Sequence, residues 1–277
     1  MEVAGIVLYN PEEKRLIENL DAIYKQVKYV ILVDNGSQNV DQISAILRNY
    51  SNSILIRNDK NMGIATALNQ LVSKAKSMNA EWVLTLDQDS VCQKDIIDKY
   101  KEFVKDHSDA AIVSCVIEDR NVSKPVKDDL DFEYEKIDFC ITSASFTNVE
   151  KIREIGGFDD KLFIDMVDYD ICYAARRAGY SIYRINYVGL LHEVGHSEEH
   201  KLFGKHLIAY NHSAFRKYYW SRNSIYFVRK YNLGIRKGLV RVFKRIVITI
   251  LYEKDKKQKV MSLFTGIVDG FKMNLDA

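Results

Sequence analysis

Residues 81–90 of the chain read EWVLTLDQDS. The apolar residues of this stretch are typical of a buried β-strand, and the strand ends by placing Asp87 and Asp89 two residues apart. Two carboxylates this close repel each other, so we expect a nearby positive charge. A divalent cation such as Mg²⁺ or Mn²⁺ takes oxygen ligands and often binds carboxylates together with a substrate phosphate. The alternative is a solvated turn in which Asp-Gln-Asp-Ser caps the next helix.

The same kind of strand recurs along the first hundred residues. Apolar runs lie at residues 3–9, 29–34, 53–57 and 82–87, and helix-period segments lie between them at about 11–26, 38–49 and 63–78. Short runs that are apolar on both faces and alternate with helices predict a parallel sheet covered by helices on both sides. A fifth run at 110–115 continues the sheet. We therefore predict an α/β fold with a mostly parallel central sheet.

Polar residues follow each of these strands, and ligands of parallel sheets bind beyond the carboxyl ends. The residues are Tyr9 and Asn10 after the first strand, Asp34, Asn35 and Ser37 after the second, Asn58, Asn61 and Gly63 after the third, and Asp87 and Asp89 after the fourth. Asp34 is suited to accept the N3–H of a uracil or thymine, and backbone N–H groups at Asn61-Met62-Gly63, at a helix start, are suited to face phosphate or ribose. Each feature alone is an ordinary turn or cap, but together they predict a nucleotide-sized crevice.

The alternation fades beyond residue 115. We predict a strand at 139–146, short and longer helices at 148–160 and 166–180, a strand at 181–188, and helical structure from about 205 to 273.

A second acidic group lies at the start of the predicted helix at 166–180. Asp165 and Asp168 would share one face of a helix, and one of them could serve as a general base. The alternative is an acidic helix start favoured by the helix dipole, with Asp170 paired to Arg176 or Arg177.

His192 follows apolar residues in GLLHEVGHSEEH and could complete a carboxylate metal site, although a lone histidine is more often a satisfied polar residue. With His196 and His200 it forms HxxxHxxxH, which would suit zinc on a helix. Gly195 and the loop-like composition argue against that helix.

The C-terminal part is basic. Residues 215–260 contain 14 Lys and Arg against two acids, a charge of +12, whereas the whole chain carries +2 and the remainder therefore −10. Arg216, Arg222 and Arg229 could hold a diphosphate or form a basic helix face. The segment 239–252 is a basic amphipathic helix, which could lie on an anionic membrane or pack on the rest of the chain or a dimer partner.

Composition excludes several other classes of protein. The chain has 277 residues, is 47% hydrophobic and contains two prolines, so it is long enough for a sizeable core and has no flexible linker. Its four cysteines form no CxxC pair, which favours free thiols in a reducing cytoplasm. The N-terminus lacks the pattern of a signal peptide, and no apolar run reaches the ~20 residues of a membrane span.

Six motifs, in order over residues 3–196, resemble those of the family 2 glycosyltransferases, most closely the bacterial rhamnosyltransferase-like branch. They are VLYNP, ILVDNGS, NMGIATALNQ, LTLDQDS, GGFDDKLFIDMVDYDICYAARRAGY and LLHEVGH, and YYWSRN extends the resemblance to about residue 223. It implies a GT-A fold with a catalytic domain at 1–204 and a basic helical region at 205–277. The catalytic domain would consist of a nucleotide-binding half, 1–115, and an acceptor half, 116–204.

The resemblance also implies a role for each site residue. Tyr9, Asn10 and Asp34 would hold the base and ribose, and Asn61 and Gly63 would line the nucleotide pocket. Asp87 would touch ribose or metal-bound water, and Asp89 would bind the metal directly. His192 would contact metal or diphosphate, and Arg222 would close over the phosphates. The acidic pair before the family's acceptor helix appears here as Val167-Asp168, with valine where glutamate is common. We therefore assign the base to Asp168, and the departure leaves room for Asp165 to share that role.

The function implied is an inverting, Mg²⁺- or Mn²⁺-dependent transfer of rhamnose from dTDP-rhamnose to a lipid-linked saccharide in bacterial surface polysaccharide synthesis. It would take place in the cytoplasm, with no nucleic-acid partner. The resemblance does not determine the role of the basic helices, so peripheral membrane contact through 236–259 and packing on the catalytic domain or in a homodimer both stay open.

Other functions remain open. UDP-galactofuranose, UDP-glucose or UDP-galactose are alternative donors. A nucleotidyltransferase would need a Gly-rich basic loop that VLYNPEEKR lacks. A third alternative is a non-catalytic module that binds anionic lipid or nucleic acid through the basic C-terminal part.

Overall fold

The computed structural model describes residues 1–119, 132–192, 198–202, 205–209 and 211–275. The chain forms two compact units, of which the first comprises Met1–Lys161 and Val167–Glu193 and is called the sheet unit below. The second comprises Leu162–Met166 and Val194–Ala277 and is called the helical unit. The chain therefore enters the helical unit for five residues, returns to the sheet unit, and leaves it again after residue 193.

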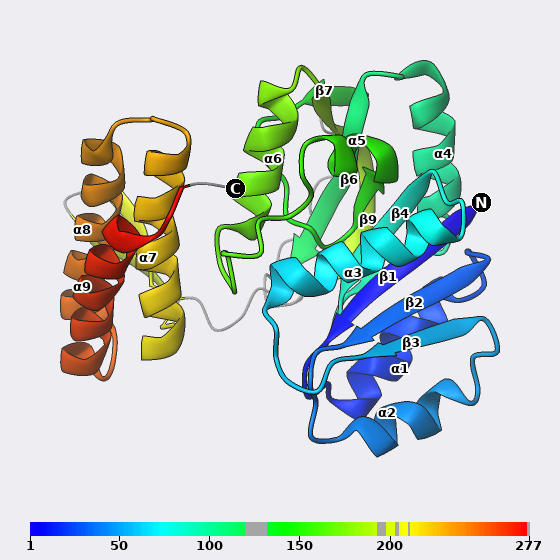
Figure 1. Ribbon diagram of the computed structural model, residues 1–277, viewed down its shortest axis with the longest axis horizontal. Coiled ribbons are helices and arrows are strands. Elements are labelled where there is room, and N and C mark those ends of the chain that lie inside the picture. Colours follow the sequence, from blue (N-terminus) through cyan, green and yellow to red (C-terminus); the bar gives the residue numbers. More distant parts are fainter. Residues whose placement is uncertain (120–131, 193–197, 203–204, 210, 276–277) are drawn as a thin grey trace. The chain divides into compact units, whose positions relative to one another are not determined.

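The sheet unit is built on a sheet of nine described strands (Figure 1). Four of them are parallel, in the order β3-β2-β1-β4: β1 (Glu2–Leu8), β2 (Tyr29–Asp34), β3 (Ser53–Arg57) and β4 (Trp82–Asp87). Beyond β4 the order continues as β8-β6-β9-β5, and β7 pairs with β9 outside this path. These strands are β5 (Val91–Cys92), β6 (Ala110–Asp119), β7 (Tyr134–Lys136), β8 (Ser145–Asn148) and β9 (Ser181–His192). β8 is antiparallel to both of its neighbours, β4 and β6.

Helices cover both faces of this sheet. They are α1 (Glu13–Ile23), α2 (Val40–Leu47), α3 (Ile64–Ser77), α4 (Ile96–Asp106), α5 (Val149–Glu154) and α6 (Val167–Arg177). One face carries alternate residues such as Ile6 and Leu84 into a single core with α1, α2 and α4. On the other face, α3 packs closely on the sheet, because a Cβ at Gly5 would lie only 2.9 Å from the Leu71 side chain of α3. The fold confirms the predicted α/β class and its mostly parallel sheet.

Three predicted strands match the structure residue for residue, at 29–34, 53–57 and 82–87. The strand predicted at 139–146 is wrong, because β8 begins at Ser145 and Ala144 adopts φ 60°. The preceding loop satisfies its backbone through other partners: Ala144 donates to the Thr85 carbonyl at 2.8 Å and accepts from the Tyr100 hydroxyl at 2.6 Å.

Helical structure was predicted from about residue 205, but the structure forms a β-hairpin there. β10 (Glu198–Leu202) pairs antiparallel with β11 (Lys205–Ala209). A short apolar run such as HLIA is compatible with either a strand or a helix, and the pairing partner decides between them.

The helical unit is an up-down-up bundle of α7 (Ala214–Lys230), α8 (Ile235–Tyr252) and α9 (Lys256–Lys272) (Figure 1). Among the described residues, Ile225, Val242, Ile246 and Leu263 form a buried apolar cluster between the three helices, with Trp220, Val260 and Ile267 packed against it. α9 packs very closely on α7, because a Cβ at Gly266 or Gly270 would lie 2.5 Å from a backbone oxygen of α7. Among the described helices, none is both long enough and apolar enough to cross a bilayer.

A buried charge cluster adds to this apolar cluster. Lys217 of α7 forms an ion pair with Glu253, whose other oxygen lies 3.2 Å from Lys259 Nζ of α9, and all three side chains are at most 5% exposed. Burial lowers the pKa of Lys217 to about 8, against the opposing effect of Glu253. A single carboxylate therefore compensates two buried cations that join the three helices.

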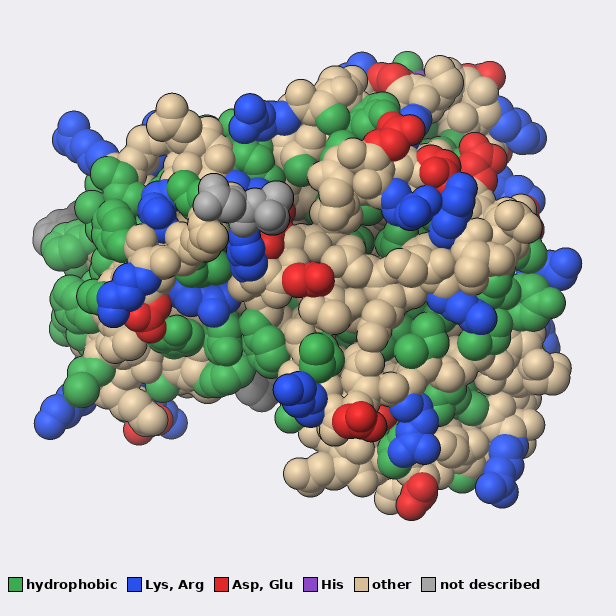
Figure 2. Space-filling view, viewed as in Figure 1, with side chains coloured by type: hydrophobic (Ala, Val, Ile, Leu, Met, Phe, Trp, Pro, Cys, Tyr) green, Lys and Arg blue, Asp and Glu red, His purple; other side chains and the backbone are tan. Residues whose placement is uncertain are grey.

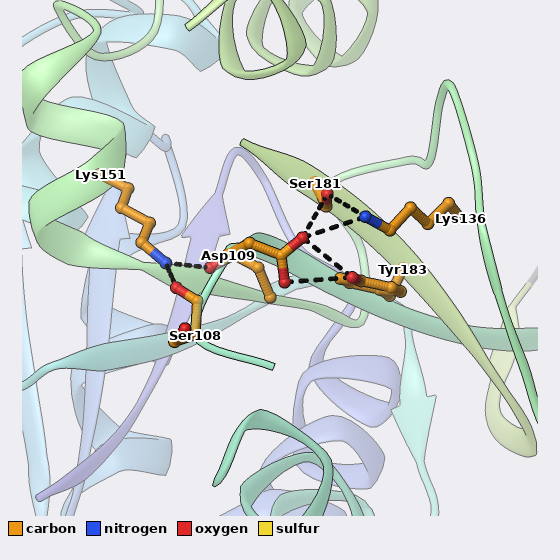
Figure 3. A network of polar contacts seen from close by, with 7 residues as sticks. Ser108, Asp109, Lys136, Lys151, Ser181 and Tyr183 are labelled. Carbon is orange, nitrogen blue, oxygen red and sulfur yellow. Dashed lines mark hydrogen bonds and ion pairs between the residues drawn. The ribbon is translucent and has the colours of Figure 1, made fainter. Parts of the chain in front are cut away.

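In the sheet unit, Asp109 joins the start of β6 to β7 and β9 (Figure 3). Its carboxylate accepts hydrogen bonds from Ser181 at 2.7 Å, Tyr183 at 3.0 Å and Lys136 at 3.1 Å. Lys151 of α5 donates to the carbonyls of Ser108 and Ala110, the residues on either side of Asp109. Burial alone would raise the pKa of Asp109, but these hydrogen bonds outweigh it and lower the pKa to about 2. The network therefore contributes stability above the ordinary carboxyl pKa of 3.8 that is lost as the pH falls toward 2.

We predict that Glu253→Gln lowers the free energy of unfolding of the helical unit by about 3–5 kcal/mol, because two buried ammonium groups lose their counter-charge. Lys217→Met should cost less, about 1–2 kcal/mol, since Glu253 keeps its contact with Lys259. Urea denaturation followed by Trp220 fluorescence, in a Trp82→Phe background, measures both changes. Equal losses in the two variants would contradict the unequal roles of the three charges.

Candidate functional site

The polar strand ends of the sheet unit meet at one edge. The parallel register pairs Leu8 with Asp34, Val7 with Asp87, and Asp34 with Arg57. Strands β1 to β4 therefore end at nearly the same level, and the residues that follow them lie side by side. The structure confirms that these polar residues share an edge, which is where ligands of parallel sheets bind.

Asn35, directly after β2, organises the loop before α3. Its side-chain amide donates to Asn61 Oδ1 at 3.0 Å and to the Gly63 carbonyl at 3.2 Å. Its Oδ1 accepts from Met62 N at 2.9 Å and from Asn58 Nδ2 at 3.1 Å. Asn35 is buried, so this one side chain fixes the position at which α3 begins.

These contacts correct one expectation. The backbone N–H groups of Met62 and Gly63 were predicted to face a phosphate or ribose, but they donate within the loop, to Asn35 Oδ1 and Asn61 Oδ1 respectively. The donors that this end of α3 offers a ligand are instead the amides of its first turn, which have no partner within the helix itself.

The turn after β2 is closely packed on that loop. Gly36 has φ +82°, and a Cβ there would lie 2.6 Å from the Lys60 backbone, so only glycine fits. Asp34 is buried, and its Oδ1 accepts from Ser37 N at 3.2 Å. In the structure Asp34 therefore caps its own turn, and its contact with a base stays a prediction.

The end of β1 is tied to both of its neighbours. Tyr9 N donates to Gln88 Oε1 at 2.8 Å, and Asn10 N donates to Ser37 Oγ at 2.8 Å. The Tyr9 ring is left exposed beside the strand ends. Gln88 thus anchors the turn between Asp87 and Asp89, a role that the sequence analysis did not assign to it.

The backbone of the Asp87–Asp89 turn is held from two sides. Asn19 of α1 is fully buried and donates to the Asp87 carbonyl at 2.6 Å, and Asp87 N donates to Ser143 Oγ at 3.1 Å. Both carboxylates are half-buried. Among the residues that the structure describes, none makes a hydrogen bond or ion pair with the Asp89 carboxylate. Asp89 is therefore a half-buried anion without compensation from the described side chains.

Asp168 lies in the first turn of α6 and reaches the same loop. Its Oδ1 accepts from Thr142 N at 3.0 Å, and Thr142 O in turn accepts from Thr85 Oγ1 of β4 at 2.5 Å. Asp87 and Asp168, which are 81 positions apart in sequence, are thus bonded to adjacent residues, Ser143 and Thr142. This loop was predicted as a strand, so its role in joining the two acids could not be seen from the sequence.

We predicted that Asp165 and Asp168 share one face of a helix, and the structure shows that they do not. Asp165 and Met166 have φ of 65° and 68°, outside the helical region, and α6 begins only at Val167. Within the helical unit, Asp165 forms an ion pair with Arg216 at 2.7 Å. Burial and the charge of Arg216 lower the pKa of nearby His212 to about 4, so this imidazole is neutral at pH 7.

The other two arginines of α7 differ in their surroundings. Arg229 donates to the Gly270 and Met273 carbonyls at 2.8 and 3.0 Å and so caps the C-terminus of α9. Arg222 lies over the Tyr219 ring, 4.6 Å from its centroid, and donates to Asn223 at 2.9 Å. Its predicted contact with phosphate stays a prediction.

The histidine part of the metal prediction is not tested. His192 is the last residue of β9, but its side chain, His196 and the His200 side chain lie outside the described part. Among the described side chains, no three His, Cys, Asp or Glu residues are grouped to hold a metal ion. Asp87 and Asp89 do fit the pattern of two carboxylates that bind Mg²⁺ or Mn²⁺ together with a substrate phosphate.

The sequence is similar to those of known proteins. A family model described as Glycosyl transferase family 2 matches residues 4–156. Over 273 residues the chain is 28% identical to a protein named dTDP-rhamnosyl transferase RfbF from Shigella flexneri, and the match covers 93% of this chain and 90% of that protein.

Solved structures share the fold at low sequence identity. S. aureus TarS 1-349 in complex with UDP-GlcNAc has a TM-score of 0.65 and 18% identity, over 97% of this chain and 81% of that one. The mannosyltransferase PcManGT from Pyrobaculum calidifontis, in complex with GDP-Man and Mn²⁺, has a TM-score of 0.61 and 15% identity, over 99% and 75%. The chain spans 44% of a longer S. aureus TarS chain.

We predict that Asn35→Ala weakens binding of UDP or dTDP at least about tenfold, because the loop before α3 loses four hydrogen bonds from one buried side chain. Titration calorimetry measures the affinity. Asn52→Ala is the matched control, since Asn52 also bridges backbone carbonyls, of Tyr24 and Val27, and precedes β3 at its opposite end. Equal nucleotide affinity in the two variants would show that Asn35 has no role in the site.

Proposed function

The chain belongs to glycosyltransferase family 2, and on that premise we propose that it transfers rhamnose from dTDP-rhamnose to a hydroxyl of a saccharide acceptor. Family membership confirms the resemblance seen in the motifs and makes the protein an enzyme, a glycosyltransferase. It therefore excludes the two alternative functions, a nucleotidyltransferase and a non-catalytic binding module. The choice of rhamnose is supported by the similarity to the Shigella flexneri protein, and UDP-galactofuranose, UDP-glucose and UDP-galactose are the alternative donors.

One observation carries the assignment of the reaction to this site. Asp87 N donates to Ser143 Oγ, and Asp168 Oδ1 accepts from Thr142 N. The backbone of Asp87, on the proposed leaving-group side, and the carboxylate of Asp168, the proposed base, are therefore held by neighbouring residues of one loop. A single displacement needs both groups near one anomeric carbon, with the base and the leaving group on opposite sides of it.

In this proposal Asp168 is the general base. It removes the proton from the acceptor hydroxyl as that oxygen attacks the anomeric carbon, and the bond from this carbon to the diphosphate oxygen breaks in the same step. The configuration inverts, and no covalent sugar-enzyme intermediate forms. Asp165 is held by Arg216, which favours a positioning role for Asp165 and leaves the proton transfer to Asp168.

The donor would lie along the edge formed by the ends of β1 to β4. Tyr9, Asn10 and Asp34 would hold its base and ribose, and Asn61 and Gly63 would line the pocket. The exposed Tyr9 ring offers a stacking surface for the base. Arg222 is proposed to bind the phosphates, a task that suits a planar guanidinium.

Asp89 and Asp87, together with His192, would hold Mg²⁺ or Mn²⁺ with the donor diphosphate. A divalent ion there supplies Lewis-acid stabilisation of the charge that develops on the leaving diphosphate. Asp89 suits this role because it is half-buried and lacks a partner among the described residues.

The proposed acceptor side contains an aromatic pair that the sequence analysis missed. The Tyr169 ring stacks on Phe139, with centroids 3.9 Å apart, and Tyr169 remains 43% exposed directly beside Asp168 in sequence. An exposed aromatic ring on the helix that carries the proposed base suits contact with the apolar face of a sugar. The acceptor we propose is a lipid-linked saccharide of bacterial surface polysaccharide synthesis, met at the cytoplasmic face of the membrane.

We predict that Asp168→Asn lowers kcat by about 10²–10⁴-fold with little change in donor KM, because the amide keeps the hydrogen bond from Thr142 N but cannot accept the proton. Asp89→Ala should lose activity and, unlike Asp168→Asn, should also weaken donor binding in the presence of Mn²⁺. Transfer from labelled dTDP-rhamnose and UDP-sugars measures both. Asp138→Asn is the control, because Asp138 is an exposed acid that pairs with Arg176 of α6, the helix that carries Asp168. Near-normal transfer by Asp168→Asn would refute the assignment.

Tyr169→Ala should raise the acceptor KM about five- to tenfold, the size expected from the loss of one aromatic contact. Tyr169→Phe keeps the ring and should behave as the wild type. Neither variant should change donor hydrolysis in the absence of acceptor. An equal effect of both substitutions would assign the hydroxyl group, rather than the ring, to the acceptor.

A further inference from the structure

We propose that one side of the α8–α9 helix pair docks on an anionic lipid bilayer, with its apolar side chains in the interface and its cations on the lipid headgroups. The site already described uses none of these residues. The proposal therefore stands on the surface of the helical unit alone and does not depend on the identity of donor or acceptor.

α8 leaves more large apolar side chains exposed than it buries. Its buried positions are Gly238, Val242, Ile246 and Thr249, at helical spacing. Large apolar side chains follow them by one position and are exposed: Leu239, Phe243 and Ile250, with Val240 and Leu251 beside them. Phe243 is 65% exposed, so a bulky aromatic residue is left in water.

α9 repeats this arrangement. Its exposed apolar residues Met261, Phe264, Val268 and Phe271 are spaced three, four and three apart, and they form one stripe along the helix. The stripe again follows the buried positions by one residue, as in Phe264 after Leu263 and Phe271 after Gly270.

Both stripes lie on the side of the pair that faces away from α7. Gly238 of α8, and Gly266 and Gly270 of α9, face α7, because a Cβ at each would meet atoms of that helix. One residue further along a helix is a rotation of about 100°. Counted in this way, Phe243 and Ile250 stand roughly 140° and 120° around α8 from Gly238, and Val268 stands roughly 160° around α9 from Gly266 and Gly270. Both stripes therefore turn away from α7, and Figure 2 shows apolar and basic side chains side by side over these helices. The two stripes are called the apolar patch below.

The charges around the apolar patch favour anionic lipid over other occupants. Exposed cations lie along α8 and at the turn into α9: Arg236, Lys237, Lys244, Lys254, Lys256 and Lys257. From Ile235 to Lys272 the chain has three acids, of which Glu253 is buried and Asp269 accepts from Tyr218 and lies 3.7 Å from Lys272. A second copy of this surface would bring like charges together, whereas anionic headgroups would neutralise them.

The chemistry is that of an interfacial contact. Apolar side chains inserted at the acyl boundary, with Lys and Arg at headgroup level, are the pattern by which amphipathic helices bind membrane surfaces. Two antiparallel helices present this pattern together, on a bundle held by the close contact of α9 with α7. The contact should weaken with added salt, because its electrostatic part is screened.

The test is binding of the full chain to vesicles, measured by co-sedimentation. The probes are vesicles of phosphatidylcholine alone and of an equal mixture of phosphatidylcholine and phosphatidylglycerol. We expect binding to the anionic vesicles only. The doubles Phe243→Ser with Phe264→Ser, and Lys244→Glu with Lys257→Glu, should each lower the partition coefficient roughly tenfold or more.

Two matched controls accompany these variants. Phe243→Leu with Phe264→Leu keeps the apolar surface and should bind as the wild type. Lys94→Glu with Lys99→Glu makes the same charge change at exposed positions of the sheet unit and should have a much smaller effect. The charge reversals lie on the surface and leave the core residues intact, so the test does not depend on the serine variants folding.

Two results would overturn the proposal. One is equal binding to both kinds of vesicle or to neither. The other is a dimer in sedimentation equilibrium that dissociates in the Phe243→Ser, Phe264→Ser variant, which would assign the apolar patch to a second copy. Transfer to a short water-soluble acceptor should be unchanged in the charge-reversal variant, so a failure of the donor or acceptor assignment would be seen separately.

Discussion

The parallel pairing of β1 with both β2 and β4 is the constraint on which the rest of the site depends. One register sets Leu8 beside Asp34 and Val7 beside Asp87, so three strands deliver their polar residues to one level. A shift of one residue would turn each side chain to the opposite face of the sheet and bury the polar residues in the apolar core. Asn35 and Gln88 then lock the loops that follow, and the position of each proposed ligand contact derives from that edge.

Local apolar pattern was enough to predict the sheet. The strands at 29–34, 53–57 and 82–87 were predicted residue for residue because each is a short apolar run bounded by polar turns. The same reasoning failed at Phe139–Ala144, an apolar segment whose backbone is satisfied by Thr85, Tyr100 and Asp168 from distant parts of the chain. Partners that lie far away in sequence leave no periodic signal.

The candidate site was predicted in part for the same reason. Residues that directly follow strands, such as Asp34 and Asp87, can be found from the pattern, and the family resemblance added Asp168. The residues that hold the loops around them are polar side chains whose role appears only in the hydrogen bonds: Asn19, Asn35, Gln88 and Ser143. Asp165 was misplaced because two consecutive residues with positive φ, at 165 and 166, precede the helix, and nothing in ordinary residues at those positions predicts that conformation.

The excursion of residues 162–166 into the helical unit limits how this protein can be divided. The chain passes between the units at three points, so no single cut separates them. Asn223 donates to the Ile164 and Asp165 carbonyls at 2.8 and 2.9 Å, and Arg216 pairs with Asp165. A truncated enzyme ending after β9 would keep Asp168 but lose the groups that hold the segment immediately before it. Any attempt to express the sheet unit alone, or to exchange helical units between relatives, must therefore treat 162–166 as part of the second piece.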